Sequence, residues 1–196
     1  MNAYLTEEER AKFAAVKIGI AGAGGLGSNC AMHLVRAGLR NFTIADFDVV
    51  NESNLNRQFF FRRQLGEKKV AALRENLLAI DPEISVNAVD ARVDAGNIAA
   101  LFGDCDLLVE AFDDVESKMV FIAEALKLAK PVVTASGLAG WGNSNAIEVG
   151  RLGRVVTVGD GATPVARDCA PQSPRVGIAA AMQANAVVSL ILGLPL

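Results

Sequence analysis

The sequence predicts an α/β fold built on a doubly wound, mostly parallel sheet. Short apolar segments alternate with longer segments of helical spacing along most of the 196 residues, which is typical of βαβ units. Hydrophobic residues make up 52% of the chain and aromatic residues only 6%, a balance that fits buried parallel strands. A glycine-rich turn joins the first expected strand to a helix. These observations together indicate a Rossmann-like fold.

Each element follows from its local pattern. Parallel strands are predicted at residues 16–21, 41–46, 84–89, 107–111 and 131–135. Helices are predicted at residues 6–15, 26–37, 67–80, 94–101 and 115–129, and an apolar helix of about 15 residues is expected after Pro174. Residues 146–149 and 155–158, joined by a turn at 150–153, predict an antiparallel hairpin extension near the C-terminus.

Composition bounds the class of protein. No linker, repeat or low-complexity tract interrupts the chain, so residues 1–196 are expected to form a single domain. The net charge of −3 and the lack of a basic block argue against a nucleic-acid partner. The three cysteines, Cys30, Cys105 and Cys169, form no Cys-x-x-Cys pair. Their odd number and the lack of a signal peptide favour a cytoplasmic location.

The apolar C-terminal segment is a candidate for a membrane helix. Residues 176–196 carry only Gln183, Asn185 and Ser189 as polar side chains. A membrane helix needs about 20 apolar residues, whereas Gly193 and Pro195 end this run early. We therefore expect a buried or subunit-interface helix and no membrane span.

The glycine-rich turn is the first candidate binding feature. It matches G-x-G-x-x-G between a strand and a helix, the context in which the backbone turns tightly and admits phosphates. The helix start offers free N–H groups and a positive dipole end to an anion. The candidate nucleotide-binding residues here are Gly22, Gly24, Gly25, Leu26 and Gly27. A tight turn without ligand is the alternative, and the motif alone does not choose the nucleotide.

Carboxylates follow the second strand. Asp46 ends this strand nineteen residues after Gly27, where an acid accepts hydrogen bonds from ribose hydroxyls. Asp48 is a further, weaker candidate. A simple turn residue is the alternative for Asp46, and the pair of features fits NAD-dependent enzymes as well as enzymes that use ATP.

The residues after Asp46 separate these classes. A dehydrogenase continues with a helix, whereas this chain has a polar stretch with Asn54, Arg57 and Gln58, and then Lys69 near the next helix start. Two cations can clamp a triphosphate and stabilise charge on the transferring phosphates. A solvated charged loop is the alternative.

At this point the sequence resembles a known family. Residues 46–58 read D-F-D-x-V-x-x-x-N-L-x-R-Q, and residues 65–69 read L-G-x-x-K, as in the ThiF/MoeB/HesA superfamily, which also holds the ubiquitin-activating enzymes. Residues 136–145 (S-G-x-A-G-x-G-x-S-N) and 174–178 (P-R-V-G-I) resemble the short, zinc-less ThiF branch. The resemblance extends from residue 16 to residue 192.

The resemblance implies roles for the matching positions. The glycine loop would line an ATP site and Asp46 would hold the ribose. The residues that match phosphate contacts are Asn54, Arg57, Gln58 and Lys69. Asp113 matches the aspartate that binds Mg²⁺, and its alternative is a helix N-cap, a role that Asp114 can also fill. Arg57, Lys69 and Asp113 are the expected catalytic residues.

The reaction implied is adenylation of the C-terminal glycine carboxylate of a small ubiquitin-like sulfur-carrier protein with a Gly-Gly end, as in thiamine biosynthesis. The carboxylate is already a nucleophile, so positioning and charge neutralisation are the catalytic task. The family is typically homodimeric, and we expect a homodimer here. Trp141 is either a contact for the carrier tail or a packed loop residue.

Three positions depart from the family pattern or stay secondary. The larger relatives hold zinc with two Cys-x-x-Cys pairs, so no zinc is expected here. Cys169 lies in the loop where some relatives carry a sulfur-transfer cysteine, but its surroundings do not match, and an incidental thiol is preferred. Arg10 is a weak candidate for an arginine given to a partner subunit. His33 is interpreted as structural.

Other functions were weighed against this one. An NAD(P)-dependent oxidoreductase shares the glycine loop and Asp46 but leaves Asn54, Arg57 and Lys69 unexplained. A non-catalytic subunit with the same fold conflicts with the retention of all these residues. Activation of a molybdopterin-synthase carrier, or of a tRNA, differs only in substrate, and the acidic balance makes tRNA the weakest of these.

Overall fold

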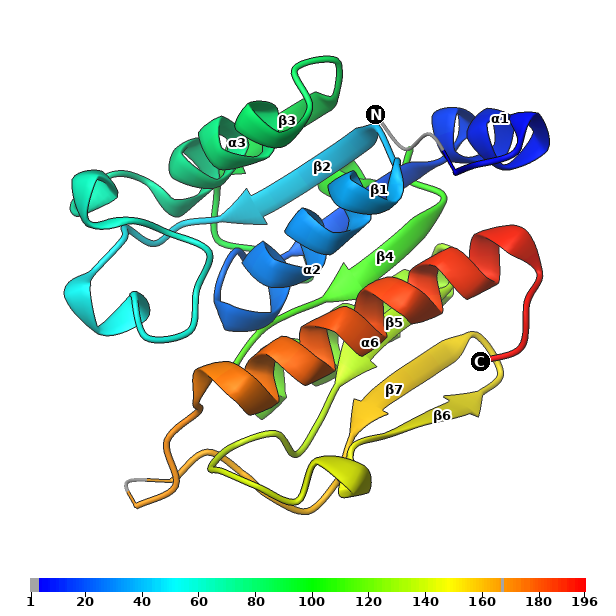
Figure 1. Ribbon diagram of the computed structural model, residues 1–196. Coiled ribbons are helices and arrows are strands. Elements are labelled where there is room, and N and C mark those ends of the chain that lie inside the picture. Colours follow the sequence, from blue (N-terminus) through cyan, green and yellow to red (C-terminus); the bar gives the residue numbers. More distant parts are fainter. Residues whose placement is uncertain (1–3, 167) are drawn as a thin grey trace.

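The computed structural model describes residues 4–166 and 168–196. Within these residues, seven strands form one sheet in the order β3-β2-β1-β4-β5-β7-β6. The strands are β1 (Lys17–Ala21), β2 (Asn41–Asp46), β3 (Ser85–Asp90), β4 (Leu107–Glu110), β5 (Val132–Ala135), β6 (Glu148–Leu152) and β7 (Val155–Gly159). Neighbouring strands are parallel except β6 and β7. The predicted fold class, with its antiparallel hairpin extension, is confirmed (Figure 1).

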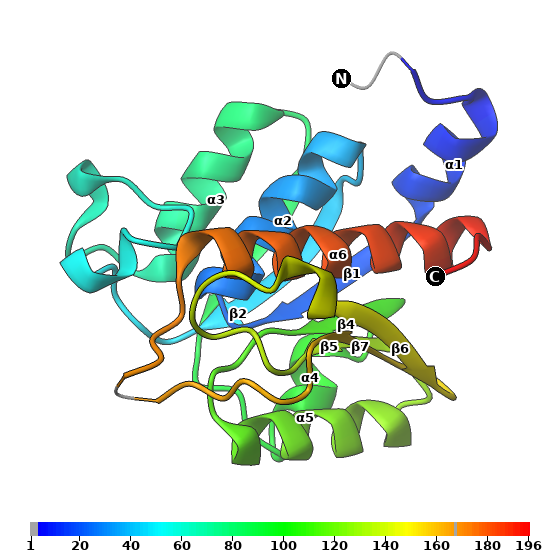
Figure 2. The same cartoon turned by 60° about the horizontal axis from the view of Figure 1, so that its bottom comes forward.

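Helices cover both faces of the sheet. They are α1 (Glu7–Ala15), α2 (Gly25–Ala37), α3 (Lys69–Ile80), α4 (Ile98–Phe102), α5 (Val115–Lys127) and α6 (Ser173–Leu192). Figure 2 shows α2, α3 and α6 on one face and α4 and α5 on the other. The result is a three-layer α/β/α arrangement, in which both faces of the parallel strands are buried.

Local signals in the sequence set several helix ends. Thr6 and Glu9 form the expected capping box, in which the Thr6 Oγ1 accepts from the Glu9 amide at 3.2 Å and the Glu9 carboxylate accepts from the Thr6 amide at 2.7 Å. Gly38 ends α2 in the left-handed conformation, with φ of 114°.

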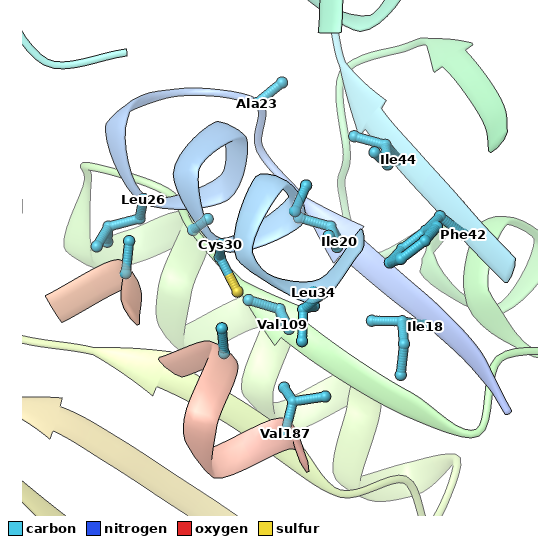
Figure 3. Close-up of a cluster of buried hydrophobic side chains, with 14 of the residues drawn as sticks. Ile18, Ile20, Ala23, Leu26, Cys30, Leu34, Phe42, Ile44, Val109 and Val187 are labelled. Atoms are coloured by element: carbon cyan, nitrogen blue, oxygen red, sulfur yellow. The ribbon is translucent and has the colours of Figure 1, made fainter. Parts of the chain in front are cut away.

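The larger core lies between the sheet and the layer of α2, α3 and α6. Figure 3 shows Leu34 of α2 beside Val109 and Ile18 of the sheet, with Val187 of α6 in the same cluster. All four are buried. The smaller core lies under α4 and α5, where Phe102 packs edge-on against the ring of Phe121 at a centroid distance of 5.7 Å. These two cores hold the sheet that carries the candidate site.

Three predicted boundaries were wrong. Helix α4 begins at Ile98, not at Asp94, because the Asp94 carboxylate accepts from the Gly96 amide at 2.8 Å in a turn. Strand β6 spans Glu148–Leu152 rather than 146–149, so the hairpin turn is shorter than expected and contains Gly153 at φ of 59°. Helix α6 has 20 residues and includes Pro174 in its first turn, where a missing N–H costs nothing.

Of the helices in the described part of the chain, α6 is the one that is long and apolar enough to cross a membrane, judged by length and composition. Half of its most apolar window is buried inside the protein. It packs against α2 and strands β5 and β7, and it crosses the face of the sheet (Figure 1). Its apolar character is therefore used, at least in part, in the core of this domain.

Truncation of a core side chain tests this packing. Leu34→Ala removes a buried side chain between α2 and the sheet and leaves a cavity, so the free energy of unfolding should fall by about 3 kcal/mol. Urea denaturation measures the change. The matched control is Leu126→Ala on α5, where the side chain is 43% exposed, and it should change stability by less than about 0.5 kcal/mol.

Candidate functional site

The strand order places the candidate residues at one edge of the sheet, the edge formed by the carboxyl ends of the parallel strands. Helices α2 and α3, which follow β1 and β2, cover one face, and α4 and α5 cover the other (Figure 2). The direction of winding therefore reverses between the neighbouring strands β1 and β4. In open α/β sheets, ligands bind outside the carboxyl ends of the strands at this reversal. Ala21, Asp46 and Glu110 end the neighbouring strands β1, β2 and β4 there.

The glycine-rich turn closes on itself at this edge. Gly22 has φ of +98°, and a Cβ atom on it would lie 2.8 Å from the Ala111 carbonyl oxygen. A Cβ atom on Gly27 would lie 1.8 Å from the Gly22 carbonyl oxygen. Only glycine fits at both positions, and helix α2 begins within the turn at Gly25, with Gly24 as its N-cap. The turn thus presents a helix N-terminus to the reversal point.

Asp46 holds this turn in place. Its Oδ2 accepts from the Ala23 amide at 2.7 Å, and its Oδ1 accepts from the Asp48 amide at 2.8 Å. Each carboxylate oxygen can accept a second hydrogen bond. The sequence predicted a ligand-binding acid at this position, and the structure adds that the acid also anchors the glycine-rich turn.

Lys69 and Asp48 form an ion pair beside the turn. The Lys69 Nζ lies 2.7 Å from the Asp48 Oδ2, and the Lys69 amide donates to the Asp48 carbonyl oxygen at 3.0 Å. The Lys69 side chain is only 7% exposed, whereas that of Asp48 is 48% exposed. A buried ammonium needs a partner. Asp48 provides it, which is a role the sequence did not indicate.

Arg57 and Gln58 lie against the start of α2. A Cβ atom on Gly25 would lie 3.4 Å from the Arg57 Cγ, and one on Gly24 would lie 3.9 Å from the Gln58 Nε2. The Gln58 Oε1 is buried and has no hydrogen-bond partner among the described residues. A buried acceptor without a partner at this turn fits a site that a ligand or water completes.

Two polar residues of α2 join segment 54–60 to the glycine-rich turn. Ser28 Oγ donates to the Gly24 carbonyl oxygen at 2.6 Å and accepts from the Phe59 amide at 3.0 Å. Asn29 Nδ2 donates to the carbonyl oxygens of Gly25 at 2.6 Å and Arg57 at 2.8 Å. Neither residue was predicted from the sequence. Their signal is a pair of polar side chains in the first turns of a helix that is otherwise largely apolar.

Asn54 shapes the loop that carries Arg57. Its Oδ1 accepts from the Asn51 amide at 3.0 Å within the short 3₁₀ turn η1 (Glu52–Asn54), and its carbonyl oxygen accepts from the Arg57 amide at 3.2 Å. The Arg57 Nη1 donates to the Asn56 Oδ1 at 2.8 Å. Burial lowers the pKa of Arg57, and the nearby Asp113 carboxylate opposes that shift. Arg57 and Asp113 therefore lie within electrostatic reach across the reversal point.

Asp113 follows β4 and its side chain is exposed. Asp114 is the N-cap of α5, because its Oδ1 accepts from the Ser117 amide at 2.8 Å, so the capping alternative for Asp113 is excluded. The described residues contain no group of three or more His, Cys, Asp or Glu side chains that would hold a metal by themselves. One exposed carboxylate fits Mg²⁺, which commonly binds one or two carboxylates together with phosphate oxygens and water.

A cleft of about 260 Å³ opens beneath this edge of the sheet, on the side of α4 and α5. Its lining includes the apolar side chains Val93, Phe112 and Val120, with Arg92 and Ser117 among the polar ones. The Arg92 guanidinium lies 5.4 Å from the centre of the ring of Phe47, the residue that follows Asp46 in the sequence. The cleft therefore neighbours the end of β2. The cleft was not predicted from the sequence.

A buried ion pair joins the two C-terminal loops. Arg175 donates through Nη2 to Asp160 Oδ2 at 2.7 Å and through Nη1 to the Gly142 carbonyl oxygen at 2.6 Å. Asp160 Oδ1 also accepts from the amides of Ala162 and Thr163, both at 2.8 Å. Burial by itself would raise the pKa of Asp160, but these hydrogen bonds outweigh it and lower the pKa to about 2.

The remaining sequence candidates lie as follows. Trp141 is 69% exposed in the loop after β5, so it is not a packed residue of that loop. Cys169 is half-buried in the neighbouring loop, and its Sγ would lie 3.0 Å from a Cβ on Gly140. His33 is half-buried in α2, where burial lowers its pKa, and Arg10 lies in α1. Neither His33 nor Arg10 is among the residues that meet at the reversal point.

The strand-to-helix glycine turn, with an acid at the end of the next strand, defines an α/β protein of the Rossmann type. The profile of the ThiF family matches residues 1–196. The chain therefore belongs to the ThiF family.

Curated proteins with similar sequences match 61% and 91% of this chain in the two cases that follow. The chain is 34% identical over 120 residues to the molybdopterin-synthase adenylyltransferase of Escherichia coli, which is 61% of the chain and 48% of that protein. It is 29% identical over 179 residues to the adenylyltransferase and sulfurtransferase UBA4 of Candida glabrata, which is 91% of the chain and 39% of that protein. The chain thus spans less than half the length of these relatives.

A solved structure shares the whole fold. The tRNA N6-threonylcarbamoyladenosine dehydratase of Escherichia coli, determined in complex with ATP, superposes with a TM-score of 0.87 at 23% identity, covering 95% of this chain and 90% of that one. This likeness shows the fold.

The packing of the glycine-rich turn is testable. Gly27→Ala forces a Cβ against the Gly22 carbonyl oxygen, so we expect a loss of about 3 kcal/mol in the free energy of unfolding. Gly150→Ala is the matched control, since a Cβ there meets nothing within 4 Å, and it should change stability by less than about 0.5 kcal/mol. Equal unfolding midpoints for both variants would contradict the described turn.

The Asp160 ion pair predicts a pH dependence. The folded pKa of about 2 lies below the usual value of 3.8, so the native state gains stability above that usual value and loses it as the pH falls toward 2. Asp160→Asn should cost about 3 kcal/mol at neutral pH and should reduce the loss of stability between pH 5 and pH 2. Urea denaturation across this range measures both effects. Asp168→Asn, exposed in the same loop, should leave the pH profile unchanged.

Proposed function

We propose that this chain uses ATP and Mg²⁺ to adenylate the C-terminal glycine carboxylate of a small ubiquitin-like carrier protein. The observation that carries the proposal is the meeting of the glycine-rich turn, Arg57, Lys69 and Asp113 at one edge of the sheet. The names of two relatives, both adenylyltransferases, support it. The ATP complex of a protein with the same fold supports the choice of nucleotide.

The nucleotide would lie along the reversal point. The phosphates would meet the start of α2, where backbone N–H groups and the helix dipole favour an anion. Asp46 would accept from the ribose hydroxyls with the lone pairs that the backbone amides leave open. The cleft beside Phe47 and Arg92, with its apolar lining, would take the adenine.

The cations would act on the phosphates. Arg57, which packs against Gly25 at the start of α2, would donate hydrogen bonds to the triphosphate. Asn54 and Gln58 would add hydrogen bonds from the same loop. Lys69 would share its charge between Asp48 and a phosphate oxygen. Asp113 would hold Mg²⁺ together with phosphate oxygens, and the ion would neutralise charge on the departing pyrophosphate.

The reaction needs no general base. A carboxylate oxygen of the carrier's last glycine attacks the α-phosphorus, the bond from that phosphorus to the bridging oxygen breaks, and pyrophosphate leaves with the electron pair. The acyl-adenylate is the product. The protein contributes orientation and a fixed set of charges, which are worth most where water is excluded.

The carrier tail would approach over the two C-terminal loops. The loop at residues 136–145 and the loop that begins at Asp160 are joined by the hydrogen bonds of Arg175, and exposed Trp141 lies on the first of them. The resemblance of this half to the short ThiF branch favours a thiamine-type sulfur carrier. The name of the Escherichia coli relative favours a molybdopterin-synthase carrier equally. Both belong in the test, with a homodimer as the expected assembly.

ATP–pyrophosphate exchange tests the reaction. Purified thiamine-type and molybdopterin-synthase-type carriers with a Gly-Gly end are each supplied, and carriers without these two glycines serve as controls. Exchange with either intact carrier supports the proposal and identifies the substrate. A lack of exchange with every Gly-Gly carrier, while ATP still binds, overturns it.

Variants of the site test the residue roles. Arg57→Ala and Asp113→Asn should each lower the exchange rate about 100-fold, because each removes a charge that acts on the phosphates. Arg62→Ala is the control, since that side chain is 77% exposed in an ion pair with Glu52 on the same loop. Full activity of Asp113→Asn at all Mg²⁺ concentrations would refute its role as a metal ligand.

A further inference from the structure

A fully buried carboxylate lies next to the candidate site. Glu110 ends β4 and its side chain is completely buried. Its two carboxylate oxygens lie 2.9 and 3.1 Å from the Lys118 Nζ of α5. The same carboxylate accepts from the Thr134 hydroxyl of β5 and, at 2.6 Å, from the Phe112 amide. No role in the chemistry has been assigned to any of these groups.

Glu110 also reaches the other face of the sheet through its backbone. Its carbonyl oxygen accepts from the Gln183 Nε2 of α6 at 3.2 Å. The residue is thus bonded to α5 below the sheet, to α6 above it and to the neighbouring strand. A buried polar network whose groups all have partners rigidifies the core around it, so these bonds fix the position of Glu110.

The turn that carries Asp113 is fixed on both sides of that residue. On one side the Phe112 amide donates to Glu110, and on the other the Asp114 carboxylate accepts from Ser117 at the start of α5. The Ala111 amide donates to the Ala21 carbonyl oxygen at 2.9 Å, next to the glycine-rich turn. Asp113 is the exposed residue between these anchors.

Stability alone is a weak reason for this arrangement. Leu108, two residues earlier on the same face of β4, is an apolar core residue. A buried ion pair usually contributes no more than well-packed apolar side chains of the same volume, because both charges lose their hydration. A charged pair differs from apolar side chains in that its hydrogen bonds orient specific groups. The Glu110 carboxylate fixes the amide of Phe112, and the Lys118 ammonium fixes that carboxylate.

We propose that Glu110, held by Lys118 and Thr134, is a positioning residue that fixes the backbone turn of Asp113 and so directs its carboxylate toward the metal-bound phosphates. This inference rests on the proposed ATP- and Mg²⁺-dependent function. It adds Glu110 and Lys118 to the residues on which the site depends, although neither touches the nucleotide.

Nucleotide binding tests the proposal without turnover. The dissociation constant of a non-cleavable ATP analogue is measured by calorimetry with Mg²⁺ and again with a chelator. Glu110→Gln keeps an acceptor for Phe112 but removes the charge that holds Lys118. We expect it to weaken binding about 10-fold with Mg²⁺ and to leave binding without metal unchanged. In an Asp113→Asn background, Glu110→Gln should weaken binding no further.

The matched control is Glu124→Gln on α5, the helix that carries Lys118; it removes the ion pair with Lys127, in which the two charged atoms lie 2.6 Å apart. It should leave both dissociation constants unchanged. If Glu110→Gln does not fold because Lys118 is left without its partner, Glu110→Gln combined with Lys118→Met removes both charges, and Thr134→Val removes a single hydrogen bond. Each should reproduce the Mg²⁺-specific loss.

Two results overturn the positioning role. Equal weakening with and without Mg²⁺ would mean that Glu110 only supports the fold, and an effect that adds fully to that of Asp113→Asn would mean that the two residues act independently. A wild-type protein that binds no ATP analogue would instead refute the proposed function itself. The two failures are therefore distinguishable.

Discussion

The close approach of the backbone at Gly22 and Gly27 is the constraint on which the candidate site depends. A Cβ on Gly27 would lie 1.8 Å from the Gly22 carbonyl oxygen, so the chain can pass from β1 into α2 this tightly only with glycine. The tight turn brings the start of α2 to the point where the sheet reverses its winding. Asp46, Ala111 and segment 54–60 are then built around it through hydrogen bonds to Ala23, Ala21 and the first turns of α2.

Buried charges stabilise the segments that surround this turn. Lys69 is paired with Asp48, Glu110 with Lys118, and Asp160 with Arg175. Each pair joins two different segments of the chain, and each lies near the carboxyl ends of the strands. Burying such a pair costs the hydration free energy of both charges, and the attraction between the charges offsets this cost only when their geometry is specific. Their common effect is to hold loops at this edge in one arrangement, which is what a site for a flexible, highly charged ligand requires.

Much of the fold could be predicted from the sequence because its signals are local. The spacing of apolar residues, the glycines and the helix caps predicted the strands β1, β2 and β4 and the limits of α1, α2 and α3 to within two residues. The error at α4 arose because the Asp94 side chain bonds a turn in place of the helix start, and the error at α6 arose because proline fits the first turn of a helix as well as a loop before it. Glycine, arginine and aspartate positions at the site were likewise visible as an ordered motif.

The sequence by itself therefore determined the α/β class, the glycine-rich turn and the polar stretch at residues 54–69, because each depends on residues that are neighbours in the sequence. Only the tertiary structure decided that Asp46 also anchors the turn, that Asp48 belongs to Lys69, and that Glu110 meets Lys118 beneath Asp113. These partners lie 8 to 23 residues apart, and they meet only because parallel strands end at one edge. Burial then makes the pairing obligatory, since a charge or amide removed from water must find its partner inside the protein.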